Sequence, residues 1–226
     1  MPMNYAMLTS RAVTPAPAAT IVSVEIQGPA GVLEGLLRAP AAPAGAAVVA
    51  HPHPQHGGTM HTKVVHRAAK LLSDRFSLAA LRFNFRGVGA SGGSYDEGRG
   101  ETEDLVAAAE WTRRRQPAGP FVLSGFSFGS LCALRAASRL GPDVLFLIGL
   151  PVDRWDGAAP AAPAWRVVWV QGDEDEFSPA ANARAIAEAR GWTFLSVPGA
   201  DHFFAGRLNE FEKAAGDALQ MALHGS

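Results

Sequence analysis

The sequence of 226 residues has a single cysteine, almost no net charge and no long apolar run. One cysteine, Cys132, excludes an intrachain disulfide and fits a reducing compartment. No stretch of about eighteen consecutive apolar residues is present, so a membrane span is not expected. The first residues also lack the charged start and apolar core of a signal peptide. We therefore expect a cytoplasmic protein.

Positive and negative side chains nearly cancel, with 20 Lys and Arg against 21 Asp and Glu. Basic residues gather only at Arg113-Arg114-Arg115, which is too little for a nucleic-acid-binding surface. A hydrophobic content of 48% is ordinary for a globular enzyme, and the length fits one domain. The expected partner is a small molecule, with no nucleic acid and no membrane; a homo-oligomer is compatible with the same composition.

Apolar runs typical of strands alternate with Ala-rich helical patterns after a loose leader at residues 1–19. Strands are predicted at 20–27, 32–39, 46–51, 78–84, 121–126, 143–149, 166–172 and 193–198. Helices are predicted at 63–76, 101–115 and 128–140, from the N-cap Ser178 to Gly191, and along the apolar stripe 204–219. This alternation predicts one α/β domain over 20–226 with a mostly parallel sheet. Functional residues should then follow the carboxyl ends of the strands.

Two segments match Gly-x-Ser-x-Gly, the pattern that places a reactive serine on a tight strand-to-helix turn. GFSFG is centred on Ser127 and GASGG on Ser91. A strand-like run precedes Ser127, and a helical run rich in small residues follows it. The residues after GASGG, Gly-Ser-Tyr-Asp-Glu-Gly, are poor helix formers. The sequence therefore predicts Ser127 as a nucleophile and Ser91 as a loop residue.

An activated serine needs an imidazole as base and a carboxylate that orients the imidazole. His202 follows the predicted strand 193–198, and a run of four acids follows the predicted strand 166–172. We predict that Asp175 is the carboxylate, because Gly172-Asp173 would form the turn and a residue two positions later would point back to the site. Three further acids have lesser roles: Asp173 and Asp153 are alternatives to Asp175, and Asp201 is interpreted as a helix N-cap or loop residue.

The segment HPHPQHGGTMH, residues 51–61, contains four of the seven histidines. One interpretation is a metal-dependent hydrolase with His51, His53 and His56 as ligands, but Gln55 stands where such sites have an aspartate, and the ligand set is incomplete. The other interpretation is a loop that supplies a backbone N–H to an oxyanion hole. Pro52 and Pro54 have no N–H, so His53 holds the free amide of this turn. Phe128, after the nucleophile, supplies the second donor.

Taken together, these segments resemble the α/β-hydrolase superfamily, and more narrowly the small lidless bacterial serine hydrolases related to dienelactone hydrolases. The matching segments are AHPHPQHGGTMHTKVV, LRFNFRGVGASGGSYDEGRGE, LSGFSFGS, QGDEDEFSP and GADHFF. The resemblance implies a single-domain fold with helices on both faces of the sheet, Ser127, Asp175 and His202 as catalytic triad, and His53 and Phe128 as oxyanion hole. It also implies that Asn84, Arg86 and Gly87 brace the oxyanion loop. Dienelactone hydrolases have a cysteine where this chain has Ser127.

We expect a serine hydrolase, carboxylesterase-like, that cleaves small or exposed acyl esters and needs no cofactor or metal. A thioesterase, amidase or acyltransferase would use the same residues. The linker 151–165, PVDRWDGAAPAAPAW, is too short and too rich in Ala and Pro to form a cap domain. The site should therefore be open to solvent.

Overall fold

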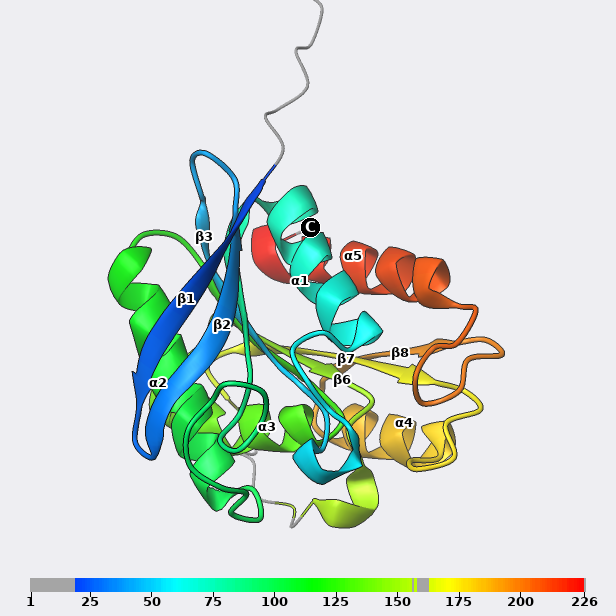
Figure 1. Ribbon diagram of the computed structural model, residues 1–226. Helices are drawn as coiled ribbons and strands as arrows, with labels where there is room; N and C mark the ends of the chain where they lie inside the picture. The colour runs from blue at the N-terminus through cyan, green and yellow to red at the C-terminus, as the bar shows by residue number, and fades with distance from the viewer. Residues whose placement is uncertain (1–18, 156, 158–162, 226) are drawn as a thin grey trace, which may run out of the picture.

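In the computed structural model, which describes residues 19–155, 157 and 163–225, the chain forms an eight-stranded sheet flanked by helices (Figure 1). The strands are β1 Thr20–Gly28, β2 Gly31–Ala39, β3 Gly45–Ala50, β4 Leu78–Phe83, β5 Phe121–Phe126, β6 Val144–Ile148, β7 Arg166–Gly172 and β8 Thr193–Val197. The helices are α1 Lys63–Phe76, α2 Arg99–Arg115, α3 Phe128–Leu140, α4 Ala180–Ala189 and α5 Leu208–His224. Each predicted strand and helix is present, with ends that differ by a few residues.

The sheet order is β1-β2-β4-β3-β5-β6-β7-β8. The β1–β2 hairpin is antiparallel and joins β4 in antiparallel pairing, and every pair from β4 to β8 is parallel. The six residues of β3 and the six of β5 are all buried, as expected for strands covered on both faces. The predicted mostly parallel sheet is confirmed.

Two apolar layers hold the helices to the sheet, and successive strand residues alternate between them. In β3, Ala46 and Val48 face the layer built with α2, α3 and α4, whereas Ala47 and Val49 face the layer built with α1 and α5. Figure 1 shows these two groups of helices on opposite sides of the sheet. Helices on both faces, as the resemblance implied, are confirmed.

Two predicted helix starts were wrong. Helix α4 begins after Pro179 and not at an N-cap Ser178, because the Ser178 hydroxyl accepts a hydrogen bond from the Val152 N–H and does not cap the helix. Helix α5 begins at Leu208, although the apolar stripe extends back to Phe204. Phe204 is fully buried but lies in a turn with a φ of 54°. The periodic spacing of apolar residues therefore predicted the burial of Phe204 correctly and its helical conformation wrongly.

Part of the connection between β6 and β7 is described. It begins with a short 3₁₀ helix, Val152–Arg154, and the described residues of this connection contain no helical cap. Residues 156 and 158–162 of the linker lie outside the described residues, as does the predicted leader apart from Ala19. Among the described helices, we find none with the length and apolarity that a membrane crossing requires.

Candidate active site

Ser127 occupies the turn between β5 and α3 with a backbone φ of 55° and ψ of −118°. Such a conformation costs a non-glycine residue about 1–3 kcal/mol and is maintained by the surrounding structure. Gly125 and Gly129 make the turn possible, because a Cβ at Gly125 would collide with the Gly129 carbonyl group, and a Cβ at Gly129 would lie 2.5 Å from the Ala50 carbonyl oxygen. The Ser127 N–H donates to the Ile148 carbonyl over 2.8 Å, which ties the turn to β6.

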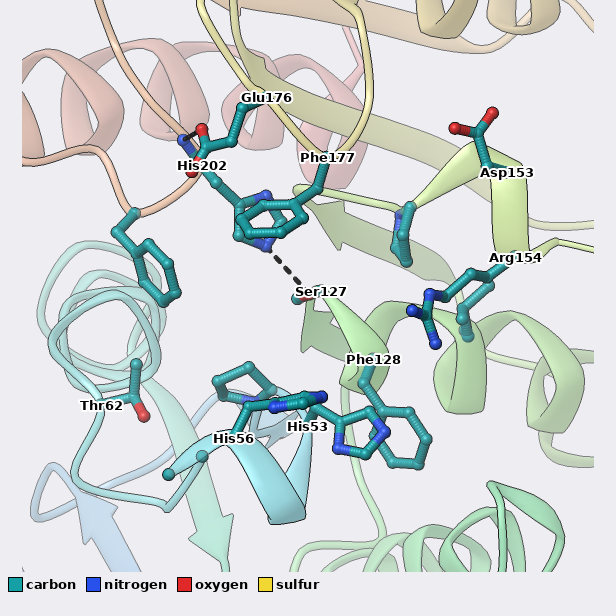
Figure 2. A pocket seen from close by; sticks show the side chains of 16 residues that line it. His53, His56, Thr62, Ser127, Phe128, Asp153, Arg154, Glu176, Phe177 and His202 are labelled. Atoms are coloured by element: carbon teal, nitrogen blue, oxygen red, sulfur yellow. Dashed lines mark hydrogen bonds between the residues drawn. The ribbon is translucent and has the colours of Figure 1, made fainter.

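The side chains of Ser127, His202 and Asp175 form one continuous hydrogen-bonded chain. Nε2 of His202 lies 2.9 Å from the Ser127 hydroxyl, as the dashed line in Figure 2 shows, and Nδ1 lies 2.7 Å from Asp175 Oδ2. A carboxylate can only accept hydrogen bonds, so Nδ1 of His202 carries the hydrogen and Nε2 is left to accept the hydroxyl proton. The structure thus brings together three residues that lie 27 and 75 positions apart.

Asp175 is buried and accepts hydrogen bonds on both carboxylate oxygens. Oδ1 accepts the backbone N–H groups of Phe177 and Ser178, at 2.9 and 3.0 Å. Oδ2 accepts the Gln171 amide at 2.6 Å as well as His202. Four donors therefore hold this carboxylate in place. Gln171 was not predicted as a site residue, although a glutamine at the end of the apolar run RVVWVQG is a visible signal.

Gln171 extends the chain into the protein interior. Its carbonyl oxygen accepts the indole N–H of Trp169 at 2.9 Å, and both side chains are fully buried. The amide group of Gln171 is therefore held at both ends, by Trp169 on one side and Asp175 on the other. This arrangement fixes the carboxylate that orients His202.

The other residues considered from the sequence lie elsewhere. Asp173 is exposed on the turn after β7, and Asp153 is exposed and points away from Ser127 in Figure 2. Asp201 is a loop residue whose side chain accepts the Ala205 N–H. Ser91 also lies in a loop, where its hydroxyl donates to the Asn84 carbonyl and accepts the N–H of Glu34. Of the acids considered, Asp175 is the one hydrogen-bonded to the imidazole ring of His202, and Glu176 accepts the backbone N–H of His202 at 3.4 Å.

His53 and Phe128 lie next to each other in the cavity wall, on the side of Ser127 opposite His202 (Figure 2). Phe128 is the first residue of α3, so its N–H has no acceptor within the helix. Neither amide donates to an acceptor among the described residues. Two residues that line the cavity beside the serine therefore have N–H groups without an acceptor in the described residues.

His51 has a structural role. Its buried ring accepts the Phe85 N–H at Nε2 over 3.0 Å, and Nδ1 lies 2.6 Å from the Pro52 carbonyl. Burial lowers the pKa of His51 to about 4, so the ring is neutral with its hydrogen on Nδ1. The ring thus joins the end of β3 to the end of β4, and both nitrogens are used.

The histidine cluster does not assemble a metal site in the described residues. His51 is engaged as above, and His56 is exposed, with its ring 4.5 Å from that of His53. Across the described part of the chain, no three His, Cys, Asp or Glu side chains come together in a way that could hold an ion. The His-x-His-x-x-His spacing instead reflects a turn with prolines at alternate positions.

Of the three residues expected to brace this loop, Asn84 does so directly. Its carbonyl oxygen accepts the Met60 N–H at 2.8 Å, and its amide donates to Glu34. Arg86 instead forms a bidentate ion pair with the buried Asp104 of α2, at 2.9 and 2.7 Å. The expectation that Arg86 contacts the oxyanion loop was wrong, because a buried carboxylate on α2 is the stronger partner for its guanidinium.

An open cavity of about 750 Å³ lies over Ser127 and His202. Phe177 and Phe203 stand at its rim on the His202 side, 54% and 49% exposed, with their rings 4.9 and 5.2 Å from the imidazole. Across the cavity, the Arg154 guanidinium points inward near Phe128 (Figure 2). The rim is thus apolar beside the imidazole and cationic on the opposite side.

Comparison with known proteins gives consistent matches. The family model described as the alpha/beta hydrolase fold matches residues 55–195. An uncharacterized protein of Rickettsia prowazekii is 34% identical over 210 residues, which is 87% of each chain. Two solved structures are each 35% identical to this chain. One is an α/β serine hydrolase without lid from Xanthomonas campestris, with a TM-score of 0.83 and coverage of 93% of this chain and 97% of that chain. The other is an α/β serine hydrolase homologue from Coxiella burnetii, with a TM-score of 0.81 and coverage of 96% of this chain and 100% of that chain.

More distant structures include an esterase of Pyrococcus furiosus, with a TM-score of 0.74, 17% identity, and coverage of 89% of this chain and 92% of that chain. At that identity the likeness shows the fold alone. The narrower relation to dienelactone hydrolases stays a prediction.

Proposed function

This chain belongs to the α/β-hydrolase family, and from that membership we propose that it is a serine hydrolase that cleaves esters through an acyl-enzyme. The observation that carries the proposal is the unbroken chain from Asp175 through His202 to Ser127, at 2.7 and 2.9 Å, on a strained turn beside an open cavity. A serine with a purely structural role in a glycine-rich turn would not require a hydrogen-bonded imidazole and carboxylate.

In the proposed mechanism, Ser127 Oγ attacks the ester carbonyl while its proton passes to His202 Nε2. Asp175 holds the imidazole in the required tautomer and stabilises the imidazolium that forms. His202 then donates the proton to the departing alcohol. A water molecule, activated by His202 in the same way, hydrolyses the acyl-enzyme and returns the serine.

The negative charge that develops on the carbonyl oxygen would be stabilised by hydrogen bonds donated by the backbone N–H groups of His53 and Phe128. Both residues line the cavity beside Ser127, and neither amide has another acceptor in the described residues. One such donor typically contributes about 3–4 kcal/mol to stabilisation of the transition state. Because the donors are main-chain groups, substitution of the His53 side chain would leave the N–H in place.

Small or solvent-exposed acyl esters are the proposed substrates. The departing alcohol lies next to His202 during protonation, and the exposed rings of Phe177 and Phe203 border that position. These rings would contact an apolar or aromatic alcohol group, and the open rim would tolerate variation in its size. A small-molecule acyl ester is therefore the proposed partner.

The test is hydrolysis of p-nitrophenyl acetate and butyrate by the wild type and by Ser127→Ala. We expect the variant to lose at least about a thousandfold in kcat while its circular dichroism and thermal unfolding stay those of the wild type. A fluorophosphonate probe should label the wild type and not the variant. The matched control is Ser91→Ala, which removes a serine from the second Gly-x-Ser-x-Gly segment and should retain labelling. Activity of Ser127→Ala near the wild-type rate would refute the assignment.

A panel with one acyl group presented as an ester, a thioester and an amide then defines the reaction. We expect the ester to give the highest kcat/KM. A thioester or amide turned over faster, with labelling of Ser127 intact, would keep the nucleophile and change the substrate class.

A further inference from the structure

The side chain of His53 is held on both ring nitrogens. Nδ1 accepts the Gln55 N–H at 3.2 Å, and Nε2 lies 3.0 Å from the hydroxyl oxygen of Tyr95. Because Nδ1 accepts, the neutral ring carries its hydrogen on Nε2 and donates it to Tyr95. Burial, together with the charges of His56 and Arg154, lowers the pKa of His53, which agrees with a neutral ring.

The backbone of His53 is restrained at the same time. Pro52 and Pro54 flank it, and its carbonyl accepts the N–H groups of His56 and Gly58, each at 3.1 Å. The carbonyl of the peptide between Pro52 and His53 lies 2.6 Å from His51 Nδ1, and the other end of this peptide is the His53 Cα, which carries the ring. A contact that holds the ring therefore adds a second restraint, at the Cα end of the peptide whose N–H is the donor.

Tyr95 touches the side chains of both residues whose amides border the serine. Its ring lies 5.1 Å from that of His53 and 6.1 Å from that of Phe128, and the rings of His53 and Phe128 lie 5.0 Å apart. The three rings form one cluster, so movement of Tyr95 would displace the side chains of both residues.

The segment that carries Tyr95 is itself anchored. Glu101 at the start of α2 is fully buried, and its carboxylate accepts the N–H groups of Asp96 and Gly98, at 2.8 and 2.7 Å. Burial, with the nearby carboxylates of Glu101 and Glu97, raises the pKa of Tyr95, so the phenol keeps its proton. A neutral hydroxyl on a fixed segment is a stable acceptor for the His53 ring.

We propose that Tyr95 is a positioning residue for the oxyanion hole: it acts through the His53 ring and the Phe128 ring to hold the two amides at the spacing that the tetrahedral intermediate requires. This inference rests on the proposed serine hydrolase function. It assigns a role to a residue that contacts neither the nucleophile nor the base.

The first experiment is Tyr95→Phe, which removes the hydroxyl and keeps the ring. We expect kcat for p-nitrophenyl butyrate to fall about five- to tenfold, with KM within about twofold of the wild type. A trifluoromethyl ketone, whose adduct with Ser127 places an oxyanion in the hole, should bind more weakly by the same factor. A merely structural role would lower thermal stability without this matched loss.

The second experiment is a double-mutant cycle with His53→Phe, which keeps the His53 amide and removes both ring nitrogens. If Tyr95 acts through His53, Tyr95→Phe should cost less than about twofold in the His53→Phe background. The matched control is Thr102→Val, which removes a hydroxyl bonded to the Gly98 carbonyl in the same segment and should leave kcat and ketone affinity unchanged.

The outcomes separate the inference from the proposed function. An active, probe-labelled wild type with an equally active Tyr95→Phe variant overturns the inference and leaves the function standing. A full loss that persists in the His53→Phe background also overturns it, because Tyr95 would then act independently of His53. A wild type that neither labels nor hydrolyses any ester overturns the proposed function itself.

Discussion

Replacement of His51 by glutamine should weaken the dependence of stability on acid pH. The folded ring has a pKa of about 4 against an ordinary value of 6.5, because it is buried. Below pH 6.5 the imidazole of the unfolded chain binds a proton that the folded ring does not. The stabilisation by neutral His51 is therefore complete above pH 6.5 and is lost as the pH falls toward 4.

The magnitude follows from the two pKa values. Between pH 7.5 and pH 4.5, linkage gives a loss of about 2.5 kcal/mol in the free energy of unfolding from this one group. Glutamine does not titrate, and its carbonyl can accept the Phe85 N–H as Nε2 does, but it lacks the contact with the Pro52 carbonyl. At pH 7.5 we expect His51→Gln to be less stable than the wild type by about 1–2 kcal/mol.

The assay is urea unfolding at both pH values, followed by the fluorescence of the five tryptophans. Carboxylates lower the stability of both proteins in acid, so the quantity to compare is the difference between the two losses. We expect the variant to lose about 2.5 kcal/mol less than the wild type, so the two stabilities should cross between about pH 5 and pH 6, and at pH 4.5 the variant should be the more stable by about 0.5–1.5 kcal/mol. Equal losses would refute the inference that the folded ring stays neutral.

Two substitutions test the site and its turn. Asp175→Asn leaves one oxygen for four donors, so we expect kcat for ester hydrolysis to fall by about four orders of magnitude. Circular dichroism should show that the variant is folded. Activity within tenfold of the wild type would contradict the proposed role. Gly129→Ala places a Cβ 2.5 Å and 2.7 Å from the carbonyl oxygens of Ala50 and His51. We expect urea unfolding to show a loss of about 2–3 kcal/mol in the free energy of unfolding. The control is Ser138→Ala at an exposed position, which should change this free energy by less than about 0.5 kcal/mol.

The strands could be predicted from the sequence because a parallel sheet covered on both faces requires continuous apolar runs. The run of β5 is buried along its whole length, and the strand is found where its residues indicate. Helix starts were harder to predict, because a side chain that could cap a helix can bond instead to a distant part of the chain. The Ser178 hydroxyl bonds to Val152, 26 positions away, and no local pattern reports that contact.

The rim of the sheet that bears the candidate site could also be predicted, since parallel strands place their carboxyl ends together. Ser127, Asp175 and His202 each follow a strand and lie at that rim. The supporting residues could not be predicted. Tyr95 comes from a glycine-rich loop 42 positions after His53, and its contact exists only because two loops meet in the folded chain.

The spacing of His51 and His53 alone does not show that their two rings have different surroundings. His51 and His53 are two positions apart, yet one is buried beneath the sheet rim and the other lies on the cavity wall. Their spacing suits metal ligation. The folded structure instead shows that each ring forms hydrogen bonds within the protein, His51 with the Phe85 N–H and His53 with the Tyr95 hydroxyl.

The hydrogen bonds from Trp169 to Gln171 and from Gln171 to Asp175 carry a practical consequence for protein engineering. Trp169 is fully buried and is not among the residues that line the cavity over Ser127. Variants restricted to the residues that line the cavity would change the contacts available to a substrate. They would leave unchanged Trp169 and Gln171, which hold the Asp175 carboxylate from the interior. Reactivity and selectivity are therefore open to separate adjustment in this molecule, the first from inside the sheet and the second from its rim.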